Sequence, residues 1–198
     1  VAHGVLALPS DGSFIYTHDG GETTSDMFVY RVGDGVTWGN TATVHIDIDG
    51  VNDAPVARAD TATTPEDTAI IIDVLANDMD VDGDRLLVAV VTQPSHGTVV
   101  NYGSTVAYTP DANFNGEDAF TYTVSDGGLT DTTTVSVTIT PVNDAPVAQD
   151  DVATTAEDTF IVIDVLANDV DVDVNLLSIS LLLQPSPGTV IHSSELLT

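Results

Sequence analysis

Short segments in which apolar and polar residues alternate recur along the chain. In segment 119–125 the apolar residues include Phe120, Tyr122 and Val124, and segment 132–140 shows a similar alternation. Because successive side chains of a β-strand point to opposite faces of a sheet, this pattern is typical of strands with one buried face. No segment shows convincing helical periodicity. The chain is therefore predicted to be all-β.

Between residues 51 and 141 such segments are separated by stretches rich in turn-forming residues. MDVDGD at 79–84 and PSHG at 94–97 are examples, and both favour reversal of the chain. Seven short strands in about 91 residues fit an immunoglobulin-like Greek-key β-sandwich. Tyr122, four residues after Asp118, is expected to form a tyrosine corner. The predicted strands are Val56–Thr63, Ala69–Leu75, Leu86–Gln93, Thr98–Tyr102, Thr105–Thr109, Ala119–Ser125 and Thr132–Thr140.

The sequence repeats itself with a period of about 91 residues. VNDAPVA at 51–57 returns at 142–148, and MFVYRVGDG at 27–35 parallels AFTYTVSDG at 119–127. Matches in one phase at such a spacing indicate tandem domains. We therefore predict the C-terminal half of one repeat, a complete repeat and the N-terminal half of a third, at residues 1–50, 51–141 and 142–198.

Each predicted half-repeat leaves strand edges and one core face without a partner. Residues 1–50 carry the back-half strands of the repeat, and residues 142–198 carry its front-half strands. We expect these halves either to be poorly ordered or to complement each other between molecules.

Charge narrows the range of partners. The chain has 26 Asp and 5 Glu against three arginines and no lysine, and its net charge is -28. This excludes a surface that binds nucleic-acid phosphates and disfavours docking on anionic lipid. Cysteine is absent, which excludes disulfides and thiolate zinc sites. No run of 18 apolar residues is present, so no membrane insertion of this segment is expected.

One acidic stretch has the composition of a cation-binding loop. Asp78, Asp80, Asp82 and Asp84 alternate with other residues, so that several carboxylates converge if the loop turns. Calcium takes six to eight oxygen ligands and makes such convergence favourable. The loop is not an EF-hand, because its twelfth position is Ala89 and strands flank it. The alternative interpretation is a solvated acidic turn.

Several motifs in a fixed order carry a family resemblance. PED at 65–67, DVDGD at 80–84, PDANFNGEDAFTYTVSDG at 110–127 and the linker VNDAP at 142–146 follow one another. In this order they resemble the cadherin-like repeats of very large bacterial surface and secreted adhesins of the RTX and VCBS type. The resemblance covers essentially the whole chain and implies tandem immunoglobulin- or cadherin-like Greek-key sandwiches.

The resemblance also implies calcium ions at the junctions between successive repeats. The linker aspartate of cadherins is Gly50 in one copy and Pro141 in the other, so we expect one or two ions per repeat instead of three. The alternative is a linker that holds no ion. The predicted metal ligands, carried over by position and taken with the rest of the Asp loop, are Asn52, Asp53, Glu66, Asp78, Asp80, Asp82, Asp84, Glu117, Asn143, Asp144, Asp171 and Asp173.

The function expected from these features is a calcium-dependent extender segment of a bacterial cell-surface or secreted adhesin. It would mediate adhesion or project a ligand-binding domain. The partners would be Ca²⁺, neighbouring repeats, and surface glycans or other proteins. No enzyme is expected, since the sequence has no HExxH motif, no recurring Ser-His-Asp spacing and no phosphate-binding loop.

A carbohydrate-binding module is the alternative function. Such a module needs an exposed row of aromatic side chains. Candidates for this row are Trp38, Tyr16, Tyr30, Tyr102 and Tyr108.

Overall fold

The computed structural model describes residues 1–185 and 189–191 and divides into two units, Val1–Thr140 and Pro141–Thr198. Within the described residues it contains strands and turns, and no helix able to cross a membrane. All-β architecture is thus confirmed. The strands are β1 (Gly4–Ala7), β2 (Ile15–His18), β3 (Ser25–Gly33), β4 (Trp38–Asp47), β5 (Asp60–Pro65), β6 (Ile70–Ile72), β7 (Leu87–Val91), β8 (Gly97–Asn101), β9 (Val106–Pro110), β10 (Gly116–Ser125) and β11 (Thr130–Thr140).

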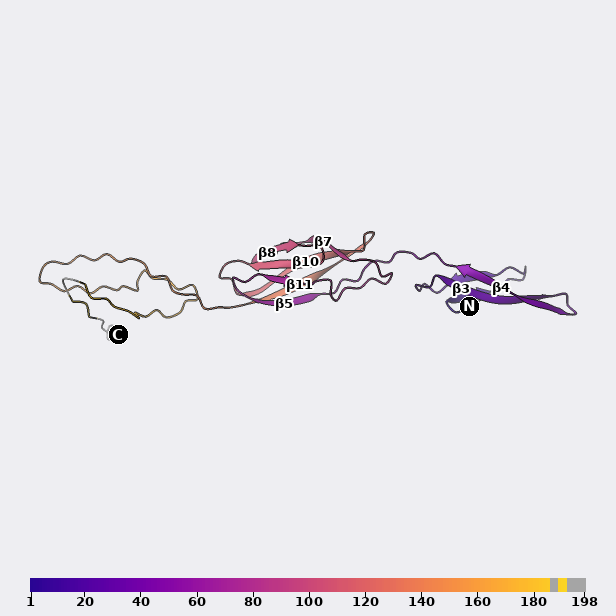
Figure 1. The fold of residues 1–198 in the computed structure, drawn as a ribbon, viewed down its shortest axis with the longest axis horizontal. Coiled ribbons are helices and arrows are strands. Elements are labelled where there is room, and N and C mark those ends of the chain that lie inside the picture. The colour runs from indigo at the N-terminus through magenta and orange to yellow at the C-terminus, as the bar shows by residue number, and fades with distance from the viewer. Residues whose placement is uncertain (186–188, 192–198) are drawn as a thin grey trace. The chain divides into compact units, whose positions relative to one another are not determined.

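Residues 60–140 form an immunoglobulin-like sandwich of two sheets (Figure 1). One sheet has the strand order β5-β11-β10-β7, and the other has the order β6-β9-β8. β10 pairs antiparallel with β11, whereas β5 runs parallel to β11 with Ala62 opposite Val137. The hairpin between β8 and β9 closes the second sheet.

The predicted alternation produces the core. Tyr122 and Val124 on β10 and Val135 and Val137 on β11 have no exposed surface, and Phe120 is 3% exposed. They pack in one cluster with residues of the opposite sheet, of the turn after β6 and of β7, which are Ile72, Val74, Val88, Val99, Val106 and Tyr108. The predicted inward faces of these two strands are therefore confirmed.

The first predicted strand begins too early. Val56 forms an isolated bridge with Met79, and β5 starts at Asp60. Carboxylates occupy the backbone donors between them, because Ala57 N–H donates to Asp131 at 2.9 Å and Arg58 N–H donates to Asp78 at 2.8 Å. Backbone donors bound in this way are not available for a strand ladder.

A buried aspartate ties the β8–β9 hairpin to β10. Asp118 is 8% exposed and accepts hydrogen bonds from the backbone N–H groups of Ser95, His96 and Ala119. The Tyr108 hydroxyl donates to the same carboxylate at 3.0 Å. Burial of this acidic group is tolerated because backbone and phenol donors satisfy it.

The same arrangement occurs in residues 1–50. Asp26 accepts hydrogen bonds from the N–H groups of Ala2, His3 and Met27 and from the hydroxyl of Tyr16. Burial alone would raise the pKa of the Asp26 carboxyl, but these hydrogen bonds hold its pKa well below the ordinary value. The β1–β2 and β3–β4 hairpins thus share the local structure of the β8–β9 and β10–β11 hairpins.

The expected tyrosine corner is not formed. The Tyr122 hydroxyl lies 2.7 Å from the Val74 carbonyl and 3.1 Å from the Arg58 carbonyl, both far upstream in the sequence. It also lies 3.0 Å from the Asp78 carboxylate. Asp118, which suggested the corner, is bound by Tyr108 instead. Tyr122 therefore joins β10 to distant segments and not to its own strand connection.

The second unit has no regular strand within residues 141–185 and 189–191. Val147 and Val170 form an isolated antiparallel bridge, as Val56 and Met79 do in the first unit. The final segment, IHSSELLT at 191–198, does not match the repeat, and only its first residue, Ile191, lies within the described part of the chain.

We predict that Asp118→Ala lowers the free energy of unfolding by about 3 kcal/mol, because it leaves buried N–H groups and the Tyr108 hydroxyl without an acceptor. Chemical denaturation followed by far-UV circular dichroism measures the change in the free energy of unfolding. Asp111→Ala, which removes the same charge from an exposed position, is the control. Equal stabilities of the two variants would contradict this role of Asp118.

Candidate metal centre

The linker and the Asp loop are folded against each other by backbone-to-carboxylate hydrogen bonds. The Asp53 N–H donates to Asp82 Oδ2 at 2.8 Å. Within the loop, Asp80 Oδ1 accepts from the N–H groups of Asp82 and Asp84 at 3.0 and 3.1 Å. Gly83 has a φ of 79°, a left-handed conformation that favours glycine and completes the turn. This places the loop carboxylates beside the linker.

Three carboxylates meet at this position. Glu22, Asp53 and Asp82 each contribute one carboxylate oxygen, and these three oxygens lie within 4.8 Å of one another. Glu22 comes from the connection between β2 and β3, Asp53 from the linker and Asp82 from the Asp loop. All three residues are exposed, and they line a cleft together with residues 20–24 and 48–51.

The electrostatics of this cluster reflect like charges in close contact. A hydrogen bond to Asp82 raises the pKa of the Glu22 carboxyl above its ordinary value, and local desolvation and the charges of Asp82 and Asp53 raise it further. The closeness of these carboxylates thus disfavours the charged form of Glu22. A divalent cation at the same point would offset this repulsion.

A buried carboxylate oxygen of the same loop points to a cation as well. Asp80 Oδ1 accepts two N–H groups, but Asp80 Oδ2 is buried and has no hydrogen-bond donor. A buried charged oxygen without a donor is costly, and coordination of a metal ion would satisfy it. Of the predicted ligands, the structure thus brings the carboxylates of Asp53 and Asp82 together, and Asp80 lies in the same loop.

The other predicted ligands near this junction are held elsewhere. The Asn52 side-chain amide donates to Asp126 Oδ2 at 2.9 Å. Asp78 binds the Tyr122 hydroxyl and the Arg58 N–H, on the core side of the loop. Asp84 takes part through its N–H, and its side chain is exposed.

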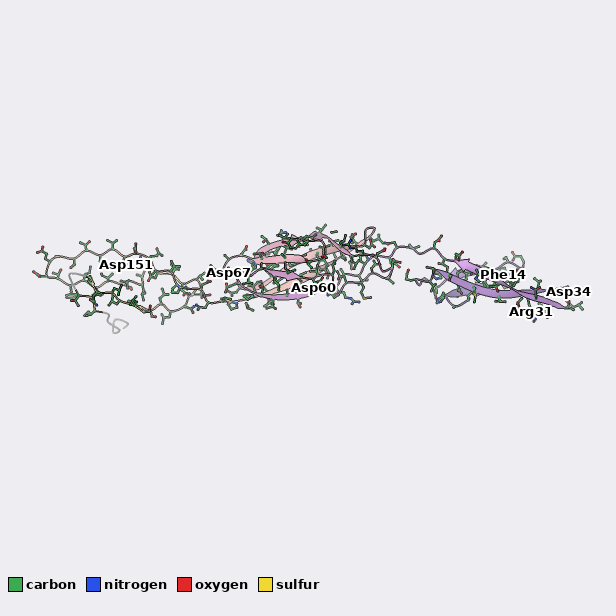
Figure 2. All side chains as sticks on the ribbon, in the orientation of Figure 1. Phe14, Arg31, Asp34, Asp60, Asp67 and Asp151 are labelled. Carbon is green, nitrogen blue, oxygen red and sulfur yellow. The ribbon has the colours of Figure 1, made fainter. Side chains whose placement is uncertain are left out.

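A second oxygen-rich group lies around the Tyr122 hydroxyl. Asp60 Oδ2 and Asn77 Oδ1 are buried without hydrogen-bond donors, while Asp60 Oδ1 accepts from the Asn77 amide at 3.0 Å. Burial raises the pKa of the Asp60 carboxyl, and the charges of Asp78 and Asp73 raise it further. A hydrogen bond with Tyr122 lowers the pKa by less than these effects raise it. Burial and Asp78 also raise the pKa of the Tyr122 hydroxyl. Asp60 is labelled on β5 in Figure 2.

The Asp loop of the second unit repeats the geometry of the first. The Asp144 N–H donates to Asp173 Oδ2 at 2.7 Å, and Asp171 Oδ1 accepts from the Asp173 N–H at 3.0 Å. Asn143 Oδ1 accepts from the Asn175 side chain at 2.7 Å. The linker and the Asp loop of the second unit are thus joined by the same hydrogen bonds as in the first.

The two predicted glutamate ligands lie at the end of β11 in the first unit. Glu66 is 3% exposed, and its N–H donates to the Thr140 carbonyl at 2.9 Å. Glu117 accepts from the Thr138 hydroxyl at 3.0 Å. Both therefore border the point at which the chain leaves β11 for Pro141.

Glu22 was missed by matching the repeats position by position. With an offset of 92 residues, Glu22 corresponds to Phe114, and the predicted ligand Glu117 corresponds to Ser25. Glu22 lies in the connection before β3, whereas Glu117 is the second residue of β10, so the two glutamates are not equivalent. The rarity of glutamate in this chain is the one signal in the sequence that singles out Glu22.

The aromatic row needed for carbohydrate binding is not assembled from the predicted residues. Tyr108 has no exposed surface, and the Tyr16 hydroxyl is bound to Asp26, so two of the candidates are engaged in hydrogen bonds. Trp38 is 68% exposed, and the Arg31 guanidinium lies 4.8 Å from the centre of its ring. Figure 2 shows Arg31 towards the tip of the β3–β4 hairpin.

The chain belongs to the bacterial Ig domain family. Its model matches residues 52–138 and 143–198, which is most of the chain. The predicted family, a bacterial immunoglobulin-like or cadherin-like repeat, is thereby confirmed. Domains of this family are typically non-catalytic repeats and occur in surface proteins.

Two curated proteins are similar over part of their length. Protein GAMETE EXPRESSED 2 of Arabidopsis thaliana is 38% identical over 72 residues, which is 36% of this chain and 8% of that protein. Extracellular matrix protein 3 of Lytechinus variegatus is 32% identical over 149 residues, 64% of this chain and 5% of that protein. The chain therefore spans less than a tenth of each relative.

Solved structures with similar folds include two endo-fucoidan hydrolases of glycoside hydrolase family 107. MfFcnA4 has a TM-score of 0.37 at 19% identity, with 72% of this chain and 22% of that chain covered. MfFcnA9 has a TM-score of 0.30 at 18% identity, with 70% and 26% covered. Likeness at this level assigns no activity.

The raised pKa of the Glu22 carboxyl predicts a pH dependence in the absence of calcium. A carboxyl with a raised pKa in the folded state stabilises the fold at low pH, and this contribution is lost as pH rises from the usual value of 4.5 through the raised pKa. As the pH is raised from 4.5 in EDTA, the melting temperature of Glu22→Gln should therefore fall less than that of wild type. Asp47→Asn, an exposed substitution on β4, should follow wild type. Parallel curves for Glu22→Gln and wild type would show that the carboxylates are not coupled.

Proposed function

We propose that this chain is a calcium-dependent extender segment of a bacterial cell-surface or secreted adhesin. In this proposal the repeats act as spacers, and calcium stiffens the junction between them. The observation that carries it is the meeting of Glu22, Asp53 and Asp82 at the linker between β4 and β5.

The ligand chemistry favours calcium. Carboxylate oxygens are hard ligands, and no cysteine is available for softer metals. Calcium accepts six to eight oxygens at about 2.3–2.6 Å in flexible geometry, and water completes a shell that protein ligands leave partly open. Asp80, with its buried donor-less oxygen, is the further ligand that the loop offers. Extracellular calcium sites typically bind at about 10⁻⁴–10⁻³ M, which suits an exposed cluster.

The free energy for stiffening comes from the charges. The three carboxylates come from separate segments, so their repulsion opposes a fixed arrangement of the linker. A bound cation converts that repulsion into coordination and holds the β2–β3 connection, the linker and the Asp loop together. The net charge of -28 increases the gain, because each bound ion also reduces repulsion over the whole chain.

The family and the relatives support an extracellular placement. Bacterial Ig domains occur in surface proteins, and the Lytechinus variegatus relative is named an extracellular matrix protein. The tandem arrangement fits a spacer, since repeated sandwiches add length without adding a catalytic centre. Adhesion itself would belong to the parent protein, of which such a segment is one part.

Calorimetric titration tests the binding site. We predict that wild type binds calcium with a dissociation constant of about 10⁻⁴–10⁻³ M. In the double variant Glu22→Gln/Asp82→Asn the calcium affinity of this junction should fall at least about tenfold. Any heat of calcium binding that remains in the variant is assigned to the loop around Asp171 and Asp173. Asp47→Asn is the control with one charge removed. Identical titrations of wild type and the double variant, or no binding to wild type, would refute the proposal.

Solution scattering tests the mechanical part. Removal of calcium with EDTA should broaden the distribution of orientations between residues 1–50 and 51–140, because the linker carboxylates then repel each other. Asp82→Asn with calcium present should behave like wild type in EDTA. Scattering profiles that do not change when EDTA is added would contradict a role of calcium in stiffening the linker.

A further inference from the structure

The linker that precedes the complete repeat begins with two contacts to that repeat. The side-chain amide of Asn52 donates to Asp126 Oδ2 at 2.9 Å, in the turn between β10 and β11. The Asp53 N–H donates to Asp82 Oδ2 at 2.8 Å. Both acceptors are carboxylates of the complete repeat, so the first residues of the linker are already bound to the domain that follows them.

The contacts continue as far as β5. Val56 and Met79 exchange two backbone hydrogen bonds, at 2.7 and 3.2 Å. The N–H groups of the next two residues donate to two further carboxylates of the same repeat, at 2.9 and 2.8 Å. β5 then begins at Asp60. From position 52 onwards the linker is therefore part of the complete repeat and not a free tether.

The same contacts recur 91 residues further along the chain. Val147 and Val170 exchange two backbone hydrogen bonds, at 2.8 and 3.1 Å, and the Gln149 N–H donates to Asp169 Oδ1 at 2.8 Å. The hydrogen bond between the second linker and its Asp loop, described above, is a third counterpart. Docking of a linker on the Asp loop that follows it is thus a property of the repeating sequence.

A short segment before the docked linker has no such contacts. The last backbone contact of the first half-repeat is the Ile48 N–H, which donates to the Thr24 carbonyl at 2.9 Å. Residues 49–51 are exposed, and in the described part of the chain they make no hydrogen bond. Apart from chain neighbours, no atom lies within 4 Å of the position that a Cβ of Gly50 would take. These three residues are therefore the least restrained part of the junction.

We propose that the linker is docked on the complete repeat before any cation binds, that Asn52 and Asp126 are the pair that positions its first residue, and that bending at this junction is confined to residues 49–51. Gly50 permits the bending, because a residue without a Cβ has the widest choice of backbone conformations. Pro141 takes the corresponding position at the other linker, where its ring restricts its own φ and the residue before it. The two junctions therefore differ in stiffness before calcium is added.

This arrangement divides the candidate metal ligands between the two sides of the bend. Asp53 and Asp82 lie on the side of the complete repeat, where hydrogen bonds hold them beside each other in spite of their like charges. Glu22 lies on the other side. The calcium part of the proposal rests on the proposed function: two ligands are set in advance, so calcium binding does not have to order the linker.

Backbone ¹⁵N relaxation of the full chain in EDTA tests the docking without any metal. We expect order parameters of about 0.85 for the non-proline residues of 52–58 and below about 0.6 for residues 49–51. Low values throughout residues 49–58, or high values throughout, would overturn the proposal. Because no calcium is present, this outcome does not depend on the proposed function.

A hydrogen-bond swap tests the positioning pair. Asn52→Asp places a second carboxylate against Asp126, so residues 52–54 should become mobile in EDTA, and the calcium affinity of the junction should fall severalfold. Asn52→Asp/Asp126→Asn restores the hydrogen bond with donor and acceptor exchanged, and should recover both properties. The amide oxygen of the new side chain can still accept from the N–H groups of the β10–β11 turn. Asn52→Asp/Asp47→Asn has the same net charge without the hydrogen bond, and should remain impaired.

Gly50→Pro copies the residue of the other linker into this junction. In EDTA it should raise the order parameters of residues 49 and 51 and leave those of residues 52–58 unchanged. An unchanged profile would contradict bending at these residues, and equal recovery in the swap and in its charge control would overturn the role of the pair. A wild type that binds no calcium would refute the proposed function, while the relaxation in EDTA would still decide whether the linker is docked.

Discussion

Repulsion between carboxylates is the constraint on which the structure of this chain depends. With a net charge of -28, the fold must place every acidic side chain either in water, against hydrogen-bond donors or beside a cation. Asp118 and Asp26 use the second solution, with backbone N–H groups and a tyrosine hydroxyl around each carboxylate. Glu22, Asp53 and Asp82 gather without such donors around all their oxygens, and a cation bound there would relieve their repulsion under the proposed function. Carboxylates thus secure the sandwich internally and also cluster at its junction.

The repeated domain structure determines where the hydrogen-bonded carboxylates and the clustered carboxylates lie. Alternating apolar residues close the sandwich of residues 60–140, and the connections at its ends carry the acidic groups. The local arrangement at Asp118 recurs at Asp26, and the loop geometry at Asp82 recurs at Asp173. The linker and Asp loop thus form the same backbone-to-carboxylate hydrogen bonds in both units.

Much of the fold could be predicted from the sequence because strand periodicity and core burial are local properties. Phe120, Tyr122 and Val124 face the core as their alternation indicates. The errors arose where a side chain competes with the backbone or acts over a long range. β5 starts later than predicted because carboxylates take the N–H groups of Ala57 and Arg58, and Tyr122 contacts segments that lie far away in sequence. Similarly, Asp78 belongs to the alternating Asp pattern but faces the core, and Glu22 joins the site from a connection of another repeat.

Crystals grown with terbium in place of calcium offer the most direct test of the central claim, because terbium scatters anomalously and binds oxygen ligands of the same kind. The account predicts an anomalous peak between the carboxylates of Glu22, Asp53 and Asp82, with oxygens at about 2.3–2.6 Å from the ion. A map without a peak at this point, and with the three carboxylates turned apart into solvent, would contradict it.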